Sequence, residues 1–492
     1  MEKHEEAVIE IASTVRQLYE KKEPFRIYHG STNTCRPPHG QRTIDISSLS
    51  NVISVDVKAK SIVVEPNVPM DRLVEATIEH GFVPEVVMEF PGITVGGGYA
   101  GSAGESSSFR YGYFSETVEW VEIVLATGEV VKASKEERAD LFHGAAGALG
   151  TLGIVTLLQI RLIPAKRFVR TTTIRTSSTK EAVQLIRETT QQDDIDYVDG
   201  ILFSKDHGAV ITGVFTDDKP AATKAQTFSD PRDPWYYLHV QSTVSAEPVI
   251  EYVPTAEYLF RYDRGGFWVG RETFQYFKFL PFTKFTRRLL DDLMHTRMLY
   301  RGVGRTQGVI VQDPSLPYST VESFIEHCAQ DLKIWPLWLC PLRETQAPSF
   351  PPSTTLRGPS TEPKPMFNIG LWGYTSSDSK TFLAQNRRLE NELTKLGGRK
   401  NLYSQTFYTE DEFWALYGRE WYEELRQRYH ATTLPSVYDK VKGGLEWNQR
   451  KMGFRARLVS LWPLRGILGM VWARRSGDYL LDRQATWKGG AD

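Results

Sequence analysis

The sequence predicts an α+β protein made of two successive parts, and three features of the 492-residue chain support this class. From residue 25 to 166, short β-branched runs alternate with turn residues, which is typical of antiparallel sheet. From residue 167 onward, helical and strand patterns are mixed, which indicates α+β packing in a second domain. The composition, 41% hydrophobic and 24% charged, is that of an ordinary globular protein.

The chain divides into four predicted segments. Residues 1–24 form a charged amphipathic helix, and residues 25–166 form the first domain. Residues 167–445 form the second domain, and the end of this segment returns to the first. In residues 446–492, arginines alternate with large apolar residues.

Periodicity predicts the individual elements. The stretch "MDRLVEATIEHGF" has apolar residues at helical spacing (Leu73, Val74, Ile78) and a glycine near its end, which predicts a helix. The stretch "VEWVEIVLATGEVVKAS" predicts a hairpin that turns at Thr127 and Gly128, and "GIVTLLQIRLIPA" predicts a long strand. In the second domain, "TKEAVQLIRETTQQ" predicts a helix, and "VDGILFS" and "AVITGVFTD" predict strands.

Charge and cysteine content exclude several classes of protein. The formal net charge is −1 without a basic stripe, so no nucleic-acid partner is expected. Three scattered cysteines are too few for a disulfide framework or a cysteine-rich zinc site, and we predict no metal site. The first 25 residues lack the apolar core of a signal peptide, and no run is long enough to span a membrane. These features predict a cytoplasmic protein.

Gly96, Gly98 and Gly101 spell G-x-G-x-x-G, the fingerprint of a dinucleotide-binding Rossmann domain. That motif requires a buried strand before it and a helix that starts inside it. Pro91-Gly92 interrupts any preceding strand, and residues 102–112 have no apolar period. We therefore interpret the match as spurious and expect a loop of open backbone.

A second glycine-containing loop, "HGSTN" at residues 29–33, follows a short predicted strand. Glycine lets a ligand approach main-chain N–H groups, and successive N–H groups form an anion-binding concavity. The two loops together are suited to hold a diphosphate. Two ordinary tight turns explain the same residues equally well.

Several long stretches resemble one known family over about residues 20–445. In the first domain they are "FRIYHGSTN", "VEPNVPMDRLVEATIEHGFVPEVVMEFPGITVGGGYAGSAGESSSFRYGYF", "DLFHGAAGALGTLGIVT" and "RLIPAK". They resemble the FAD-binding domain of the vanillyl-alcohol-oxidase/PCMH superfamily, and within it the Δ24-sterol reductase branch. The second domain continues the resemblance in "VDGILFS", "VITGVFTD", "VIVQDPSLP", "WPLWLCPL", "EDEFW" and "LPSVYDKV".

The resemblance implies a two-lobed PCMH-type FAD-binding domain followed by an α+β substrate (cap) domain. It places the FAD diphosphate on the first loop, at Gly30, Ser31, Thr32 and Asn33. The second loop encloses the other side through Thr94, Val95, Gly96, Gly97, Gly98, Gly101, Ser107, Tyr111 and Gly112. Gly153 and Ile154 supply backbone to the adenine-ribose and flavin region.

Many relatives attach flavin covalently through a histidine of the first loop or a cysteine of the second. Here no cysteine lies between Cys35 and Cys328, and His29 falls at least one place early. We therefore expect noncovalent FAD.

The resemblance further implies that NADPH reduces the flavin, which then delivers hydride to an isolated side-chain double bond of a sterol. A positioned acid must protonate the other carbon. Tyr403 is our candidate, and a packing role is the alternative; the next candidates are Tyr408, Glu410 and Asp411. Two other functions stay open. One is a flavin-dependent oxidase, dehydrogenase or isomerase acting on a terpenoid or polyketide, and the other is a non-catalytic lipid-binding scaffold.

Other residues carry weaker expectations. Trp268, Trp338 and Trp372 are suited to line a sterol-sized pocket, although core packing is the simpler interpretation. The guanidinium groups of Arg261 and Arg264 could bind the 2′-phosphate of NADPH through two hydrogen bonds each, although arginines that are solvated or paired within the protein are commoner.

The arginines and tryptophans of the tail fit a segment lying in the plane of a membrane interface. A packed C-terminal helix is the alternative. The first predicts a peripheral protein on the cytoplasmic face of the endoplasmic reticulum.

Overall fold

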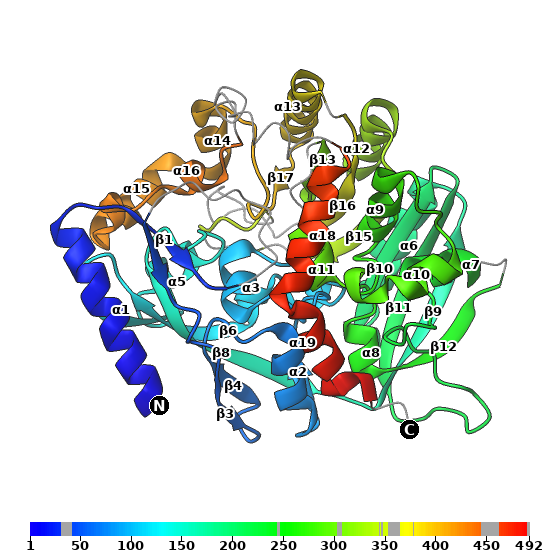
Figure 1. The fold of residues 1–492 in the computed structure, drawn as a ribbon, viewed down its shortest axis with the longest axis horizontal. Helices are drawn as coiled ribbons and strands as arrows, with labels where there is room; N and C mark the ends of the chain where they lie inside the picture. The colour runs from blue at the N-terminus through cyan, green and yellow to red at the C-terminus, as the bar shows by residue number, and fades with distance from the viewer. Residues whose placement is uncertain are drawn as a thin grey trace.

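The protein is described by a computed structural model, which covers residues 1–30, 42–243, 247–302, 308–343, 345, 348–352, 365–376, 378–443 and 462–489. Within these residues the chain forms two antiparallel sheets, joined to helices on several sides, and one small parallel pair (Figure 1). Helices and strands are both abundant, and the predicted α+β class is confirmed.

The first sheet has the order β3-β4-β8-β6-β7, and β5 pairs with the end of β8. Leu158 and Ile160 on β8 are fully buried, because this long strand lies at the centre of the sheet. The predicted hairpin and long strand are both present. The strands are β3 (Val52–Asp56), β4 (Ser61–Val64), β5 (Phe82–Pro84), β6 (Val118–Val124), β7 (Val130–Ser134) and β8 (Ile154–Pro164).

Helices and a parallel strand pair complete the first domain. The predicted helices are observed as α1 (Glu2–Glu20) and α2 (Met70–Ile78). Helix α1 buries Val8, Ile11, Val15 and Leu18, whose spacing places them on one face. The remaining elements are β1 (Phe25–Tyr28), β2 (Arg42–Asp45), α4 (Ser108–Tyr111) and α5 (Ala139–Ala145).

The chain passes into the second sheet between Pro164 and Phe168. The order of this sheet is β12-β9-β11-β10-β15-β16-β14-β17, and β13 pairs with β16. The strands are β9 (Phe168–Thr176), β10 (Tyr197–Ser204), β11 (His207–Thr216), β12 (Val249–Pro254), β13 (Val309–Gln312), β14 (Pro314–Pro317), β15 (Leu337–Leu342), β16 (Met366–Tyr374) and β17 (Arg399–Lys400).

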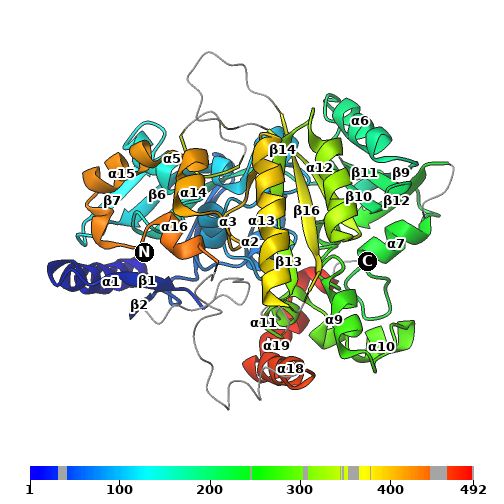
Figure 2. The same cartoon turned by 90° about the horizontal axis from the view of Figure 1, so that it is seen from above.

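Three helices cover one face of the second sheet side by side (Figure 2). They are α6 (Thr179–Thr189), α12 (Val321–His327) and α13 (Ser379–Lys395), and their apolar faces share one core with the strands. The opposite side of the sheet is rich in buried aromatic residues. Here lie α8 (Thr255–Leu259), α9 (Val269–Phe277), α10 (Lys284–Leu289) and α11 (Thr296–Gly302).

After the second sheet the chain returns to the first domain, where α15 (Arg419–Arg428) lies near α5 (Figure 1). The Lys440 Nζ donates to the Leu149 carbonyl at 2.7 Å, and the Tyr422 and Thr151 hydroxyls are 2.7 Å apart. The returning helices are α14 (Glu410–Tyr417), α15 (Arg419–Arg428) and α16 (Val437–Val441).

Two helices of the predicted tail, α18 (Leu464–Ser476) and α19 (Asp478–Gln484), pack on the body of the protein. Gly466 and Ala473 face inward from α18 and are buried. The Trp487 ring packs against the Phe260 ring in a tilted arrangement, with centroids 5.0 Å apart. Among the described residues, no helix combines the length and the apolar character that crossing a bilayer requires.

Candidate functional site

Residues 95–101 form a short helix, so the prediction of a loop here is wrong. Helix α3 (Val95–Gly101) begins at Thr94, whose Oγ1 accepts a hydrogen bond from the Gly97 N–H. Tyr99 is buried and donates its hydroxyl to the Phe142 carbonyl at 2.7 Å. The cap and this tertiary anchor stabilise a glycine-rich helix that local periodicity does not predict. Residues 85–93, all described, form turns rather than a strand, and the exclusion of a Rossmann motif holds.

Three of the segments predicted to bind cofactor converge around α3. Gly30 follows β1, and the Ile27 side chain of that strand comes so close to Gly150 that a Cβ there would lie 2.6 Å from it. The Leu149 N–H donates to the Ala100 carbonyl in α3 at 3.2 Å. The end of β1, residues 147–153 and α3 therefore pack against one another.

The glycines of α3 have two different environments. Gly96 and Gly98 are packed so closely against neighbouring residues that neither has room for a side chain. Gly97 is exposed. Gly101 faces Tyr403 of the second domain, because a Cβ placed on this glycine would lie 3.8 Å from the Tyr403 Cβ. Gly97 and Gly101 thus present bare backbone to the space beside the second domain.

The other predicted cofactor residues differ in how they lie. The Ser107 hydroxyl donates to the Glu85 carbonyl at 2.8 Å, so its side chain is engaged within the domain. Gly112 has a φ of +80° and ends α4, and Gly153 packs directly on β6. Val95 and Ile154 are buried, Tyr111 is half-buried, and Ser31, Thr32 and Asn33 lie outside the described residues.

Tyr403 lies in a polar cluster at the interface of the two domains. Its hydroxyl donates to the carboxylate of Asp313, between β13 and β14. The same carboxylate accepts from Asn368 Nδ2 at 3.2 Å and from Trp372 Nε1 at 3.1 Å, both on β16. Asp313 is buried and Tyr403 is half-buried, so the cluster reaches from the core toward the open side of α3.

Burial raises the pKa of Asp313 to about 7, against the opposing effect of hydrogen bonds from Asn368 and Trp372. Its carboxyl group therefore exchanges a proton near neutral pH, directly beside the Tyr403 hydroxyl. Sequence reasoning missed Asp313. The available signal was an acidic residue that ends the apolar run "VIVQDP" immediately before a proline.

The three alternative acids lie elsewhere. Tyr408 is buried and donates to the Glu390 carbonyl at 3.1 Å, away from Asp313. Glu410 forms an exposed ion pair with Arg419, and Asp411 is exposed on the same turn of α14. The structure therefore brings only Tyr403 of these candidates toward α3.

The predicted tryptophans form a buried aromatic cluster behind this site. The rings of Trp338 and Trp372 stack with centroids 6.0 Å apart, and Phe267 lies 4.5 Å from Trp372. The Trp268 indole donates to the Trp372 carbonyl, and the Trp338 indole donates to Asp199. The cluster packs as a wall that fixes Trp372, and through it Asp313.

Arg261 and Arg264 are both buried in ion pairs. Arg261 lies 2.9 Å from Glu89 and 3.1 Å from Asp199, which joins the two domains. Burial raises the pKa of Glu89 to about 7, although Arg261 opposes this shift. Arg264 pairs with Asp291 at 2.7 Å. Both arginines are therefore paired within the protein, as the simpler interpretation expected, and neither guanidinium is available to bind a phosphate.

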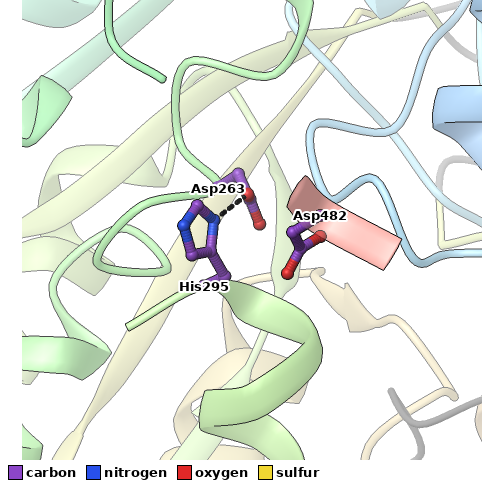
Figure 3. A group of neighbouring side chains, drawn as sticks. All are labelled: Asp263, His295 and Asp482. Atoms are coloured by element: carbon purple, nitrogen blue, oxygen red, sulfur yellow. Dashed lines mark hydrogen bonds and ion pairs between the residues drawn. The ribbon is translucent and has the colours of Figure 1, made fainter. Parts of the chain in front are cut away.

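Asp263, His295 and Asp482 bring three possible metal-ligand atoms within 4.8 Å of one another (Figure 3). The His295 Nδ1 is 2.6 Å from Asp263, and Arg297 Nε is 3.1 Å from Asp482. Burial alone would lower the pKa of His295, but the carboxylates of Asp263 and Asp291 raise it to about 9. Asp263 also accepts from the Thr296 N–H at 3.1 Å, and Asp482 pairs with Arg297, so we describe this cluster as an ion-pair network.

The His295 network makes stability dependent on pH in a predictable direction. The folded-state pKa of about 9 exceeds the ordinary value of 6.5, so stability from this proton is complete below pH 6.5 and is lost as pH rises through 9. The shift corresponds to about 3 kcal/mol of unfolding free energy. Urea unfolding between pH 6 and pH 9.5 should show this loss in the wild type and not in His295→Gln. Parallel curves for the two proteins would contradict the assignment.

Comparison with known proteins finds similarity to one domain family and to several sterol reductases. A model described as an FAD binding domain matches residues 6–134. The delta(24)-sterol reductase of Homo sapiens is 28% identical over 407 residues, covering 80% of this chain and 76% of that protein. The enzyme of the same name from Arabidopsis thaliana is 28% identical over 439 residues, covering 82% and 76%. A Caenorhabditis elegans delta(24)-sterol reductase homolog is 25% identical, covering 81% and 78%.

A more distant match is confined to part of the chain. Cytokinin dehydrogenase 9 of Oryza sativa is 27% identical over 216 residues, which cover 40% of each protein. The sterol reductases, in contrast, match well beyond the FAD binding domain. These similarities support a place for the chain in the delta(24)-sterol reductase branch of the FAD-binding superfamily.

Proposed function

We propose that the protein is an FAD-dependent oxidoreductase that reduces an isolated carbon–carbon double bond in a sterol-like lipophilic substrate, with NADPH as the source of hydride. The observation that carries this proposal is the hydrogen bond between the Tyr403 hydroxyl and the titratable carboxyl group of Asp313. The pair lies beside the exposed backbone of α3. The relatives named delta(24)-sterol reductase support the sterol class of substrate. We also propose that the enzyme works at a membrane surface, where such substrates accumulate.

The residues around α3 fit a flavin dinucleotide. Gly97 offers exposed backbone, and a side chain at Gly101 would narrow the gap to Tyr403. A large polar ligand needs bare backbone of this kind for its diphosphate. We propose that Gly30 and residues 31–33 hold one side of the diphosphate and residues 94–98 the other. Within residues 42–243, which the structure describes throughout, no cysteine is available for covalent attachment, so the proposed binding is noncovalent.

The protein's own part in the reaction is control of a proton. When bound, FAD supplies the hydride. An unactivated olefin must gain a proton on its other carbon, and the Tyr403 hydroxyl is the proposed donor. Asp313 positions this hydroxyl, and its own carboxyl proton is available to restore the phenol after transfer. Asn368 and Trp372 hold Asp313 in place through their hydrogen bonds to its carboxylate.

Anaerobic reduction tests this function directly. The purified yellow protein should lose its flavin absorbance near 450 nm on addition of NADPH and regain it when a sterol with an isolated side-chain double bond is added. Acid precipitation should release the flavin into the supernatant. Reduction that no alkene reverses would contradict the proposed substrate, and rapid reoxidation by air alone would indicate an oxidase.

A further inference from the structure

Helix α18 turns an apolar face toward solvent. Leu464, Leu468, Val471 and Trp472 are exposed, with Trp472 at 66%, and their spacing places them along one side of the helix. A surface helix of a globular protein normally exposes polar residues and buries apolar ones. In α18 the inward side is instead formed by small residues such as Gly466, where a Cβ would lie 2.5 Å from the Tyr276 ring.

The neighbouring α10 region extends this apolar surface. Phe279, Phe285 and Leu289 are among the most exposed large apolar residues described, and Phe285 is 73% exposed. A cavity of about 300 Å³ lies between this region and α18: Phe279 and Leu290 line it from one side, and Ile467, Met470 and Val471 line it from the other. Figure 2 shows α9, α10 and α18 together along one edge of the molecule. We call residues 278–289 and 462–476 the apolar edge.

Charge on the apolar edge has one sign. Residues 278–289 contain four basic side chains and residues 462–476 contain three, and neither segment contains an aspartate or glutamate. The basic residues are Lys278, Lys284, Arg287, Arg288, Arg465, Arg474 and Arg475. The chain as a whole has a net charge of −1, so this separation of charge is local.

We infer that the apolar edge binds the interface of an anionic lipid bilayer. Exposed tryptophan and phenylalanine beside lysine and arginine are the composition that lies at headgroup level in interfacial proteins. A second copy of the chain fits less well, because a two-fold contact would bring seven basic residues against the same seven. Membrane binding would bring the enzyme to its proposed lipophilic substrate. The inference rests on the proposed function only for this role, and the binding itself is argued from the surface alone.

Contacts within the protein hold the apolar edge against the rest of the fold in the absence of a membrane. Asp482 on α19 pairs with Arg297 on α11 at 3.1 Å, and Arg297 pairs in turn with Asp71 on α2. The Trp462 indole also donates to the Tyr276 carbonyl at 2.7 Å. Deleting the tail would break these contacts and open the cavity, so surface substitutions test the inference more sharply than truncation.

Vesicle binding of the full-length flavoprotein tests the inference without turnover. The protein should co-sediment with vesicles of phosphatidylcholine containing 30% phosphatidylserine, and less with pure phosphatidylcholine. Trp472→Glu combined with Leu468→Glu should weaken binding at least tenfold, because two charges would enter the apolar contact. Arg475→Gln should weaken binding to the anionic vesicles about fivefold, the effect of about 1 kcal/mol per basic residue.

Matched controls lie on distant surfaces. Ile9→Glu on α1 replaces an equally exposed apolar residue, and Lys180→Gln on α6 removes an exposed basic one. Both variants should bind vesicles like the wild type. Equal weakening in the controls, or no sedimentation of the wild type, would overturn the inference. A wild-type dimer that Trp472→Glu converts to a monomer, without any lipid dependence, would show a self-contact instead. Loss of alkene reduction with vesicle binding intact would overturn only the proposed function.

Discussion

Tyr403→Phe should slow the transfer of hydride to the alkene by about 10²–10⁴-fold, the usual contribution of a general acid. The substitution keeps the ring and its packing but removes the hydroxyl that reaches Asp313. Reduction of the flavin by NADPH should continue at its normal rate, because that half-reaction places no proton on the substrate carbon. Stopped-flow absorbance at 450 nm measures the two half-reactions separately.

Two further variants define the role of the cluster. Tyr408→Phe is the matched control, because the Tyr408 hydroxyl bonds to the Glu390 carbonyl and not to Asp313, and both of its half-reactions should be unchanged. Asp313→Asn should move the pH dependence of alkene reduction away from pH 7, because the group that titrates there is removed. Equal slowing of both half-reactions in Tyr403→Phe would indicate damage to cofactor binding. Unchanged rates in both would exclude Tyr403.

Gly97→Glu should abolish FAD binding. The position is exposed on α3, and a Cβ there would meet only the Thr94 hydroxyl closely, so a side chain needs a small local shift; its carboxylate would lie where the diphosphate is proposed to bind. The purified variant should be colourless, with a ratio of absorbance at 450 nm to 280 nm below about one tenth of the wild-type ratio. A tenfold loss of affinity corresponds to about 1.4 kcal/mol of binding free energy.

Two control variants distinguish the effect of the added charge from the effects of an added side chain and of a folding defect. Gly97→Ala adds only a Cβ, 3.1 Å from the Thr94 hydroxyl, and should retain most of the flavin. Lys58→Glu places a carboxylate on the exposed turn between β3 and β4 and should retain all of it. Normal flavin content in Gly97→Glu would remove α3 from the cofactor site.

Elements with strong local periodicity could be predicted from the sequence. Helix α2 and strand β8 carry their apolar residues at helical or strand spacing, and the turn at Gly128 has a glycine at a φ of +81°. Helix α3 could not be predicted in this way, because its stability comes from the Thr94 cap and from Tyr99 reaching Phe142, more than forty residues away.

The candidate site was only half predictable for a similar reason. The resemblance to a family implied the glycine-rich segments and the need for an acid, but local sequence alone could not separate Tyr403 from Tyr408, Glu410 or Asp411. Asp313 becomes visible only in three dimensions, because its partners Asn368, Trp372 and Tyr403 are 55, 59 and 90 residues away in the chain. An isolated aspartate at the end of a strand gives no sign of burial or of a pKa near neutral.

Arg297 limits how this chain can be recombined with similar proteins. Its guanidinium connects Asp71 of the first domain, α11 of the second and Asp482 of the final helices, all three in the interior. Removing one member of a buried ion pair leaves an uncompensated charge, which costs about 3–5 kcal/mol. A chimaera that exchanges the second domain to change substrate choice would therefore have to inherit α2 and α19 from the same parent, or replace all three charges together. Crossovers that respect only the boundary between the two sheets should give poorly folded hybrids.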